Sequence, residues 1–542
     1  MPARLLCLLF CVTLTAFGQD PFASLLNKAT PPGTFRTAVG VDRHGTAVPA
    51  LLSEEDLDYA TPKRRILLVA GLDGSSESAE AAMAAWRWFH SPEAKTWRDD
   101  FALSVVPVGN PYGWAHHAGS SNGSGGDPTT GYPPEGTAYN SETNPEAQYL
   151  WRWIGMHAPD LVVVLEKAAP ASGGLAAALE KAPPSDTGTI PVTSERGSPG
   201  FLEKVLKEQA PQNPSPARRE IQSRLDRTPT EVAEQLAKVY GHALDEVVYI
   251  PTVALISRIR LGQTEDVERI VAPYVAGKPT LPPKPTSSHL PGHLIFAELY
   301  RVTQNPRYLR LARDAANLGY DDWGVMRKAM PFHSDMSDSF FMGCAILAEV
   351  GALSGERRYF DIALRHMRYM EGLDLRDDGL YRHSPLDEAA WGRGNGFPAL
   401  GLAWSLSFIP ENDRTFAPML AAFQRHMAAL LPYQDRTGAW HQVIDKEGSY
   451  RELTSTSMIG FALARGLERG WLDGPQYEKA VERAWYAVKT RVAANGELVD
   501  VCTGTGKQPD LRSYYDRTAI LGKDDRGGAM AMLFATELGA RQ

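Results

Sequence analysis

Short apolar runs alternate with amphipathic stretches in the first 200 or so residues of the chain. Three continuous apolar runs, bounded by Gly, Pro or charged residues, are typical of buried strands: 65–70, 101–107 and 160–165. The stretches at 77–89 and 147–154 place apolar residues at helical spacing. This alternation predicts an α/β domain with a largely parallel sheet. We expect an irregular lead over 20–62 and a long surface loop over 119–140, which is rich in Gly, Ser, Pro and Asn.

Beyond residue 220 the strand signals fade and a helical repeat begins. An apolar helix, a short turn and an amphipathic helix occupy 294–313, and the same pattern returns at 344–365, about 50 residues later. Weaker copies follow at 399–425, 458–488 and 529–538. Five to six helical hairpins over roughly 320 residues predict an open solenoid or a closed α/α toroid. The glycine-rich, aromatic loops between the units favour a toroid with a central pocket.

Length supports this division, because 542 residues exceed one ordinary domain. A Pro-rich linker at 211–216 places the boundary near residue 220, which gives domains over 19–220 and 221–542. The net charge of -8 and the pI near 6.0 argue against a general nucleic-acid binder. An acidic balance still permits an anionic substrate, because a pocket concentrates the few cations that it needs.

The first residues, 1–18, have the features of a secretory signal peptide. Arg4 precedes an apolar run, and small residues follow it at the cleavage positions. No later stretch is apolar over the about 18 residues that a membrane span needs, so we expect a periplasmic or secreted protein without a membrane anchor after cleavage. An uncleaved anchor is the alternative. Outside this segment only Cys344 and Cys502 remain, too few for a disulfide framework. A single bridge is possible, but packing as small hydrophobic residues is favoured.

The richest chemistry lies in the segment 391–397, where an aromatic, a guanidinium and an amide stand among three glycines: Trp391-Gly-Arg393-Gly-Asn395-Gly-Phe397. A flat apolar face, a bidentate cation and an amide suit a sugar that carries a carboxylate. Composition alone favours equally a helix-capping turn around a core Trp.

Other motifs stand around this segment in a fixed order: His333-Ser-Asp335-Met-Ser-Asp338-Ser-Phe-Phe-Met342, Gly379-Leu-Tyr-Arg-His383, Gly438-Ala-Trp440-His441-Gln442, Ser449-Tyr450-Arg-Glu452, Val501-Cys502-Thr-Gly504, Tyr514-Tyr515 and Asp525-Arg-Gly527-Gly528. This order resembles glycoside hydrolase family 105 and its relative family 88, the unsaturated rhamnogalacturonyl and glucuronyl hydrolases. The resemblance covers roughly 230–542 and rests on the whole set of spaced motifs.

The resemblance implies an (α/α)6 barrel and a hydrolase that needs no cofactor. The implied substrates are oligosaccharides left by polysaccharide lyases, in which the terminal uronic acid carries a C4=C5 double bond. An acid protonates C4 of this vinyl ether, water adds at C5, and the resulting hemiketal opens to release the remaining sugar. One carboxyl group can serve first as acid and then as base for the water.

Site residues follow from the matching positions. Asp338, four residues before Met342, matches the catalytic acid of the family, although a helix N-cap is the alternative role and Asp335 is a rival. His383 matches an active-site histidine. Trp391 and Arg393 match a sugar platform and the cation for the uronate carboxylate. Further candidates for substrate binding complete the set: Asn395, Phe397, His333, His289 and His441.

Two departures bear on the substrate. The family has a second Asp on the preceding barrel loop, whereas this chain has Ser287-Ser-His289-Leu-Pro-Gly292, so His289 is the candidate replacement. The usual Trp after Gly-Asn-Gly is Phe397, which keeps a stacking face but lacks the indole donor.

The N-terminal domain weakly resembles the zinc carboxypeptidases of the M14 type, through 70–77, 110–113 and 160–166. Two of the expected zinc ligands are histidines, and Asp73 and Glu166 stand near their places. Zinc prefers imidazole or thiolate ligands, so we expect a degenerate domain without catalytic zinc.

The sequence thus predicts a two-domain hydrolase of unsaturated uronyl oligosaccharides. A polysaccharide lyase on a similar toroid and a non-catalytic carbohydrate-binding protein are the alternatives, and a peptidase is the least favoured.

Overall fold

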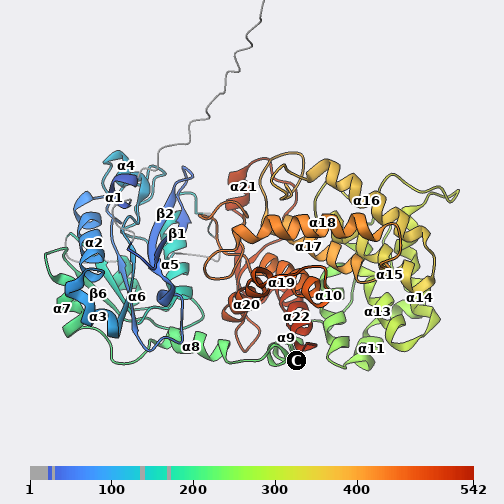
Figure 1. Ribbon diagram of the computed structural model, residues 1–542, viewed down its shortest axis with the longest axis horizontal. Coiled ribbons are helices and arrows are strands. Elements are labelled where there is room, and N and C mark those ends of the chain that lie inside the picture. Colours follow the sequence, from blue (N-terminus) through green and yellow to red (C-terminus); the bar gives the residue numbers. More distant parts are fainter. Residues whose placement is uncertain (1–21, 27–30, 135–138, 140, 168–172, 542) are drawn as a thin grey trace, which may run out of the picture.

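The computed structural model describes residues 22–26, 31–134, 139, 141–167 and 173–541 (Figure 1). The predicted signal segment over 1–18 lies outside these residues. Figure 1 shows an α/β domain beside a larger helical domain, with the segment around α21 between them.

A six-stranded sheet forms the α/β domain, in the order β1-β2-β4-β3-β5-β6. Its strands are β1 (Thr34–Val41), β2 (Ala47–Ser53), β3 (Arg64–Val69), β4 (Phe101–Val106), β5 (Leu161–Leu165) and β6 (Val192–Glu195). The last four strands of this order are parallel to one another, and the β1–β2 hairpin adds to β4 in antiparallel fashion. The three predicted strands are therefore confirmed as β3, β4 and β5.

The expectation of an irregular lead over 20–62 is wrong, because this region contains the β1–β2 hairpin. Gly40 and Pro49 interrupt its apolar pattern, and the register of the pair shifts beside Gly40. A Cβ at Gly40 would lie 2.3 Å from Tyr149 Cβ, so this strand needs glycine where it meets helix α5.

Helices cover both faces of the sheet. They are α1 (Ala23–Leu26), α2 (Ser76–Phe89), α3 (Lys95–Asp100), α4 (Pro111–His116), α5 (Pro145–His157), α6 (Leu175–Leu179), α7 (Phe201–Glu208) and α8 (Pro216–Leu225). Alternate residues of β3 point to opposite faces: Leu67 and Val69 join the core with α5 and α6, whereas Ile66 and Leu68 join the core with α2 and α7. The predicted boundary at residue 220 falls inside α8, whose Ile221 belongs to the core of the α/β domain.

The remainder of the described chain is almost entirely helical. Its elements are α9 (Pro229–Ala237), α10 (Tyr249–Arg260), α11 (Thr264–Val275), α12 (His289–Gly292), α13 (Leu294–Thr303), α14 (Pro306–Ala316), the π-helical turn η4 (Phe340–Cys344), α15 (Ala345–Ser354), α16 (Arg358–Asp374), α17 (Gly392–Leu406), α18 (Phe416–Leu430), α19 (Leu453–Glu468), α20 (Pro475–Thr490), β7 (Leu498–Cys502), α21 (Leu511–Tyr515), β8 (Ala519–Gly522) and α22 (Asp525–Gly539).

Six of these helices contact one another in chain order, and the last contacts the first: α10, α13, α15, α17, α19 and α22. Every residue of α17 is buried, which fits a helix that is enclosed on all sides. Helices such as α14 and α16 instead bury one face and expose charged residues on the other. No helix among the described residues combines the length and the apolarity that a bilayer crossing requires.

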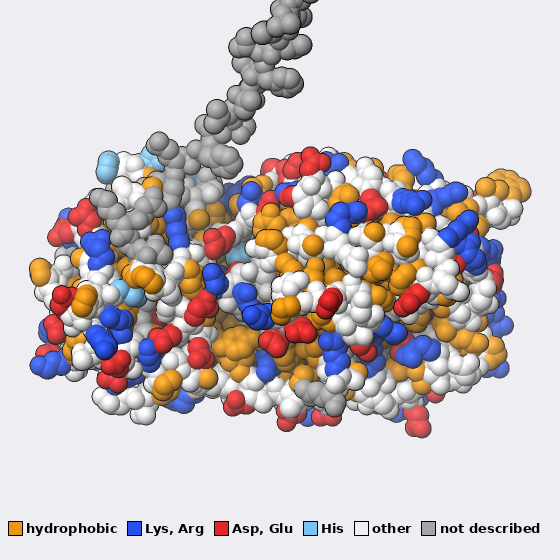
Figure 2. All heavy atoms as spheres, viewed as in Figure 1, with side chains coloured by type: hydrophobic (Ala, Val, Ile, Leu, Met, Phe, Trp, Pro, Cys, Tyr) orange, Lys and Arg blue, Asp and Glu red, His pale blue; other side chains and the backbone are white. Residues whose placement is uncertain are grey.

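Lys and Arg side chains lie beside Asp and Glu side chains over most of the face shown in Figure 2. Both remaining cysteines, Cys344 and Cys502, are buried and unbonded to each other.

Candidate active site

Asp338 stands at the turn that leads into η4 and α15. Its main-chain carbonyl accepts hydrogen bonds from Phe341 N and Met342 N, both at 3.1 Å. The side chain is 14% exposed, and within the described part of the chain its Oδ1 atom is buried without a hydrogen-bond partner. The Oδ1 atom therefore forms no capping hydrogen bond, and this oxygen remains available to exchange a proton with a substrate.

His383 lies beside this carboxyl group. Its Nε2 atom lies 3.5 Å from Asp338 Oδ1, which is an electrostatic contact longer than a good hydrogen bond. The other ring nitrogen, Nδ1, lies 2.9 Å from the hydroxyl of Tyr514. Ser337 N donates to His383 O at 3.0 Å, so the loop that carries the histidine is tied to the loop that carries Asp338.

Arg393 lies on the same side of the helical domain. The charges of Arg393 and Asp338 both act on Tyr249, where burial raises the pKa of the phenol, Arg393 lowers it and Asp338 raises it. Direct contacts also connect the two groups: Asp338 lies 3.5 Å from His383, whose ring packs on Trp391, and the Arg393 guanidinium packs on the same indole. Arg393 is the second residue of α17, and Tyr249 is the first residue of α10.

Two main-chain carbonyls and an indole ring hold the guanidinium of Arg393. Its Nη2 atom donates to Thr503 O at 2.7 Å, and its Nη1 atom donates to Cys502 O. Its carbon Cζ lies 4.7 Å from the ring centre of Trp391, a cation–π contact. Burial opposes the charge, but negative groups around it raise the pKa of Arg393, so the guanidinium stays charged.

Trp391 does not present a free stacking face. It is 1% exposed and lies between Arg393 and the ring of His383, whose centre is 4.3 Å away. Its role here is support for those two side chains. Phe397 is equally buried and packs edge-on against Tyr249 at 5.6 Å.

Asn395 differs from the expectation that it contacts a substrate. Its Oδ1 accepts from Tyr381 N at 2.9 Å, and its Nδ2 donates to Tyr381 O and Trp391 O at 2.9 and 3.0 Å. The residue is fully buried. It holds the turn before α17, which is the structural role that composition also allowed.

Three histidines from the predicted set have other partners. His289 is 4% exposed and binds Glu246 through Nε2 at 2.7 Å. His333 lies 3.1 Å from an Asp335 carboxylate oxygen and against the ring of Tyr369. His441 lies within hydrogen-bond distance of a main-chain carbonyl through Nδ1 at 2.6 Å. The structure therefore brings together Asp338, His383, Trp391 and Arg393, with Phe397 at the edge.

Two residues near Asp338 and His383 were not singled out from the sequence. Tyr514 belongs to a quoted motif, but nothing in the motif showed that its hydroxyl meets His383. Asp374, the last residue of α16, is fully buried, and within the described residues both its carboxylate oxygens are without a partner. Burial raises the pKa of Asp374 to about 8, and the charges of Asp335 and Asp338 add to the rise.

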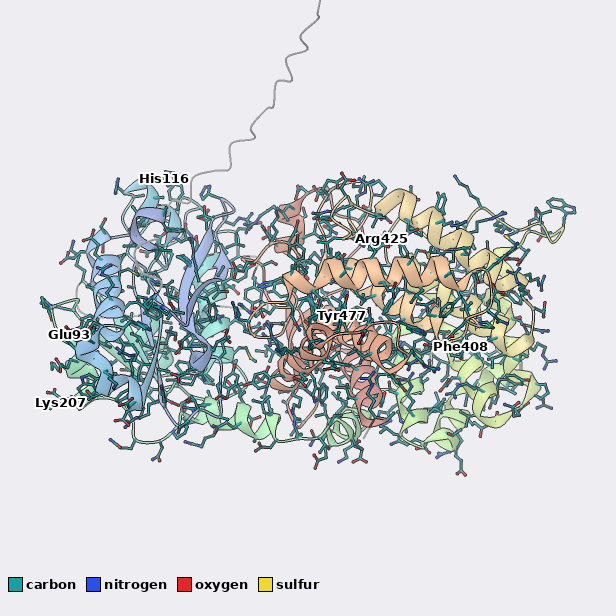
Figure 3. The ribbon with its side chains drawn as sticks, viewed as in Figure 1. Glu93, His116, Lys207, Phe408, Arg425 and Tyr477 are labelled. Atoms are coloured by element: carbon teal, nitrogen blue, oxygen red, sulfur yellow. The ribbon has the colours of Figure 1, made fainter. Side chains whose placement is uncertain are left out.

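A cavity of considerable size lies elsewhere. A space of about 670 Å³ opens where the ring helices end, whereas Asp338, His383 and Arg393 lie where they begin. Arg260, Glu298, Trp404, Arg465 and Glu537 are among its lining residues. Figure 3 shows Phe408, another lining residue, in the part of the helical domain away from the α/β domain. Since size alone does not mark a reactive site, we base the candidate site on the Asp338 group.

In the α/β domain, two acids stand near the positions where the weak resemblance to zinc carboxypeptidases expected metal ligands. Asp73 accepts hydrogen bonds from Ser75 N at 3.1 Å and from Ser78 Oγ at 3.2 Å. Glu166 lies at the end of β5, and burial raises its pKa. Among the described residues, no group of three or more His, Cys, Asp or Glu side chains is placed to hold a metal ion.

Comparison with known proteins adds a family to this geometry. Residues 276–541 match the model of Glycosyl Hydrolase Family 88. The unsaturated rhamnogalacturonyl hydrolase YesR of Bacillus subtilis (strain 168) is 25% identical over 260 residues, which are 43% of this chain and 71% of YesR. An unsaturated 3S-rhamnoglycuronyl hydrolase of Alteromonas sp. (strain LOR) is 24% identical over 217 residues, 40% of this chain and 42% of that relative.

A solved structure shows a similar fold. The possible member of the GH105 family from Klebsiella pneumoniae subsp. pneumoniae MGH 78578 superposes with a TM-score of 0.50 at 20% identity. The match covers 65% of this chain and 100% of that structure. The C-terminal part of the chain is a Glycosyl Hydrolase Family 88 domain.

Proposed function

We propose that this protein is a glycoside hydrolase that removes a terminal 4,5-unsaturated uronic acid from lyase-generated oligosaccharides. The observation that carries the proposal is the carboxyl group of Asp338. Among the described residues its buried Oδ1 atom has no hydrogen-bond partner, and it lies 3.5 Å from His383 Nε2. The ring of His383 packs on Trp391, which also contacts the charged guanidinium of Arg393. The family domain and the names of the relatives support the same substrate class.

In the proposed reaction, protonated Asp338 gives its proton to C4 of the substrate. The C4=C5 electron pair forms the new C–H bond, and positive charge develops at C5 and the ring oxygen. The resulting carboxylate of Asp338 then accepts a proton from water as the water oxygen bonds to C5. The hemiketal opens and releases the remaining sugar, and the carboxyl group is again protonated.

Neighbouring side chains have distinct tasks in this scheme. Arg393 binds the uronate carboxylate with N–H groups that are not used by the two main-chain carbonyls. His383, oriented by Tyr514, fixes the position of the Asp338 carboxyl. Trp391 supports Arg393 and His383, and Phe397 packs against Tyr249. The scheme needs no metal or cofactor.

The wider architecture follows from the same proposal. We interpret the six ring helices and their outer partners as an (α/α)6 barrel, closed by the contact between α22 and α10. The α/β domain is proposed to be a degenerate relative of the zinc carboxypeptidases. A periplasmic or secreted location would bring the protein to lyase products of acidic polysaccharides.

The test incubates the full-length protein with lyase-generated disaccharides and follows the ultraviolet absorbance of the double bond. We expect absorbance to fall with the wild type, and the Asp338→Asn variant to be slower by about 100- to 10,000-fold, as is typical for loss of a general acid. Asp335→Asn is the matched control, because this carboxylate lies beside His333. Equal loss of activity in both variants would contradict the role given to Asp338.

Two alternatives give different results in the same assay. A polysaccharide lyase would create the double bond in an intact acidic polysaccharide, so absorbance would rise. A non-catalytic binding protein would bind the disaccharide in calorimetry and leave its absorbance unchanged.

A further inference from the structure

Two elements of the helical domain, β7 and α21, lie between the α/β domain and the candidate site and contact both. Strand β7 leads into the carbonyls that hold Arg393, and α21 carries the hydroxyl that meets His383. On the side that faces the α/β domain, each element forms hydrogen bonds or an ion pair with charged residues of that domain. The α/β domain lies outside residues 276–541, which match the family model. Its contacts with β7 and α21 indicate a role at the candidate site.

The first connection runs through Asp500 in β7. Arg152 of α5 donates to Asp500 Oδ1 at 2.7 Å, and the hydroxyl of Tyr139 donates to the same oxygen at 2.9 Å. Arg152 is 6% exposed and Asp500 is 3% exposed, so the pair is shielded from water. Screening by solvent and salt is therefore weak here.

Asp500 also has an unusual backbone. Its φ is +62°, in the left-handed region, at the position where the register between β7 and β8 shifts. A non-glycine residue holds this conformation only where surrounding contacts fix it. The hydrogen bonds from the α/β domain are such contacts. Two and three residues later, the carbonyls of Cys502 and Thr503 accept hydrogen bonds from Arg393.

The second connection runs through α21. Arg43, in the turn between β1 and β2, lies 2.9 Å from an Asp516 carboxylate oxygen. In return, Arg512 donates to the carbonyl of Asp42 at 2.7 Å. Both partners flank Tyr514, whose hydroxyl lies 2.9 Å from His383 Nδ1.

We infer that the α/β domain is a positioning domain for the site. Through Asp500 it fixes the carbonyl pair that orients Arg393, and through α21 it fixes the tyrosine that orients His383. The inference rests on the proposed function, because it assigns the orientation of Arg393 to binding of the uronate carboxylate. Arg152, Tyr139 and Asp500 are thus positioning residues that touch no substrate.

The test uses full-length Asp500→Asn, which keeps the size of the side chain and removes its charge. Tyr139→Phe is a milder second variant, because it removes one hydrogen bond and keeps the stacking on Tyr450 at 4.9 Å. Arg436→Ala is the matched control. Its partner Glu54 also lies across the domain boundary, but the contact is exposed and leads to no site residue.

We expect Asp500→Asn to raise KM for the unsaturated disaccharide about 10-fold or more and to leave kcat within about 3-fold, since binding common to substrate and transition state is lost. With the methyl ester of the uronate, wild type and variant should have equal KM, because the ester offers no carboxylate to Arg393. Tyr139→Phe should shift KM in the same direction by less. A KM rise that is equal for acid and ester would overturn the inference.

Hydrogen exchange decides the same question without a substrate. In Asp500→Asn we expect amides at 391–397 and 500–505 to exchange at least about 10-fold faster than in the wild type, with no such change in Arg436→Ala. Unchanged exchange in both segments would refute the coupling. A wild type that is inactive on every unsaturated disaccharide would instead reject the proposed function, while the exchange result still judges the connection between the domains.

Discussion

Asp374 provides a quantitative test of the buried electrostatics beside the candidate site. It is the last residue of α16, it is fully buried, and both its carboxylate oxygens are without a partner among the described residues. An ionised carboxylate without hydrogen bonds is costly in such a place, so burial raises its pKa from the usual 3.8 to about 8. The folded protein therefore holds this proton at neutral pH.

The sign of the pH effect follows from this direction. Above about pH 4 the unfolded chain loses the proton from Asp374, whereas the folded chain keeps it until about pH 8. Unfolding thus releases a proton across this window, and the contribution of Asp374 to stability falls as the pH rises. At about 1.4 kcal/mol for each pKa unit, the free energy of unfolding loses on the order of 5 kcal/mol between pH 4 and pH 8.

Asp374→Asn removes this titration. The buried amide brings a cost of its own, but that cost does not change with pH, so the difference between variant and wild type isolates the carboxyl group. For a helical domain of roughly 310 residues, about 5 kcal/mol corresponds to a Tm change of roughly 8 °C. We expect the Tm of the variant, relative to wild type, to rise by about this amount from pH 4.5 to pH 8.5.

Differential scanning calorimetry across this pH range is the assay. The matched control is Asp377→Asn, three residues further along, where the side chain is exposed and already solvated. Its Tm difference from the wild type should stay nearly constant with pH. A Tm difference for Asp374→Asn that is flat or that falls as the pH rises would refute the reasoning.

Other substitutions test separate parts of the structure. Tyr514→Phe removes the hydroxyl that meets His383 Nδ1, and we expect kcat on the disaccharide to fall about 10-fold with little change in Tm, measured by steady-state kinetics and calorimetry. Gly401→Ala would place a Cβ 2.6 Å from the backbone of η4, so about 1–3 kcal/mol of stability should be lost, whereas Gly372→Ala on the open face of α16 should be neutral or stabilising by denaturant titration. Arg218→Ala removes the ion-pair partner of buried Asp160, the residue before β5. The α/β domain should lose about 3–5 kcal/mol of its free energy of unfolding, measured as faster proteolysis of its segments.

Much of the fold was accessible from the sequence, because continuous apolar runs and repeated hairpins leave strong periodic signals. Strands β3, β4 and β5 and the repeat of α13–α14 in α15–α16 are of this kind. The β1–β2 hairpin was not, since Gly40 and Pro49 break its pattern and its burial comes from contacts with α5. Local pattern fails where tertiary contacts decide the structure.

The site shows the same limit. Asp338, His383 and Arg393 were proposed from motif order, and the structure places them in one cluster around Trp391. Tyr514 and Asp374 were not singled out, because what marks them is their surroundings in the fold. Tyr514 meets a ring nitrogen from 131 residues earlier, and the Asp374 carboxylate has no hydrogen-bond partner among the described residues. Neither property can be predicted from the residues that are adjacent in the sequence.

The segment 391–397 shows why its two interpretations were hard to separate. Asn395 ties down the turn and Trp391 is buried, as the capping interpretation requires. Arg393 keeps its charge in the cluster that holds Trp391, His383 and Asp338, as the sugar-binding interpretation requires. The glycines make the two roles compatible: a Cβ at Gly392 would lie 2.7 Å from a main-chain oxygen of the neighbouring loop. This close approach lets α17 begin beside the main-chain carbonyls that orient the guanidinium of Arg393. The structural interpretation is therefore a condition of the functional one, and a bulkier residue at this glycine would disturb both together.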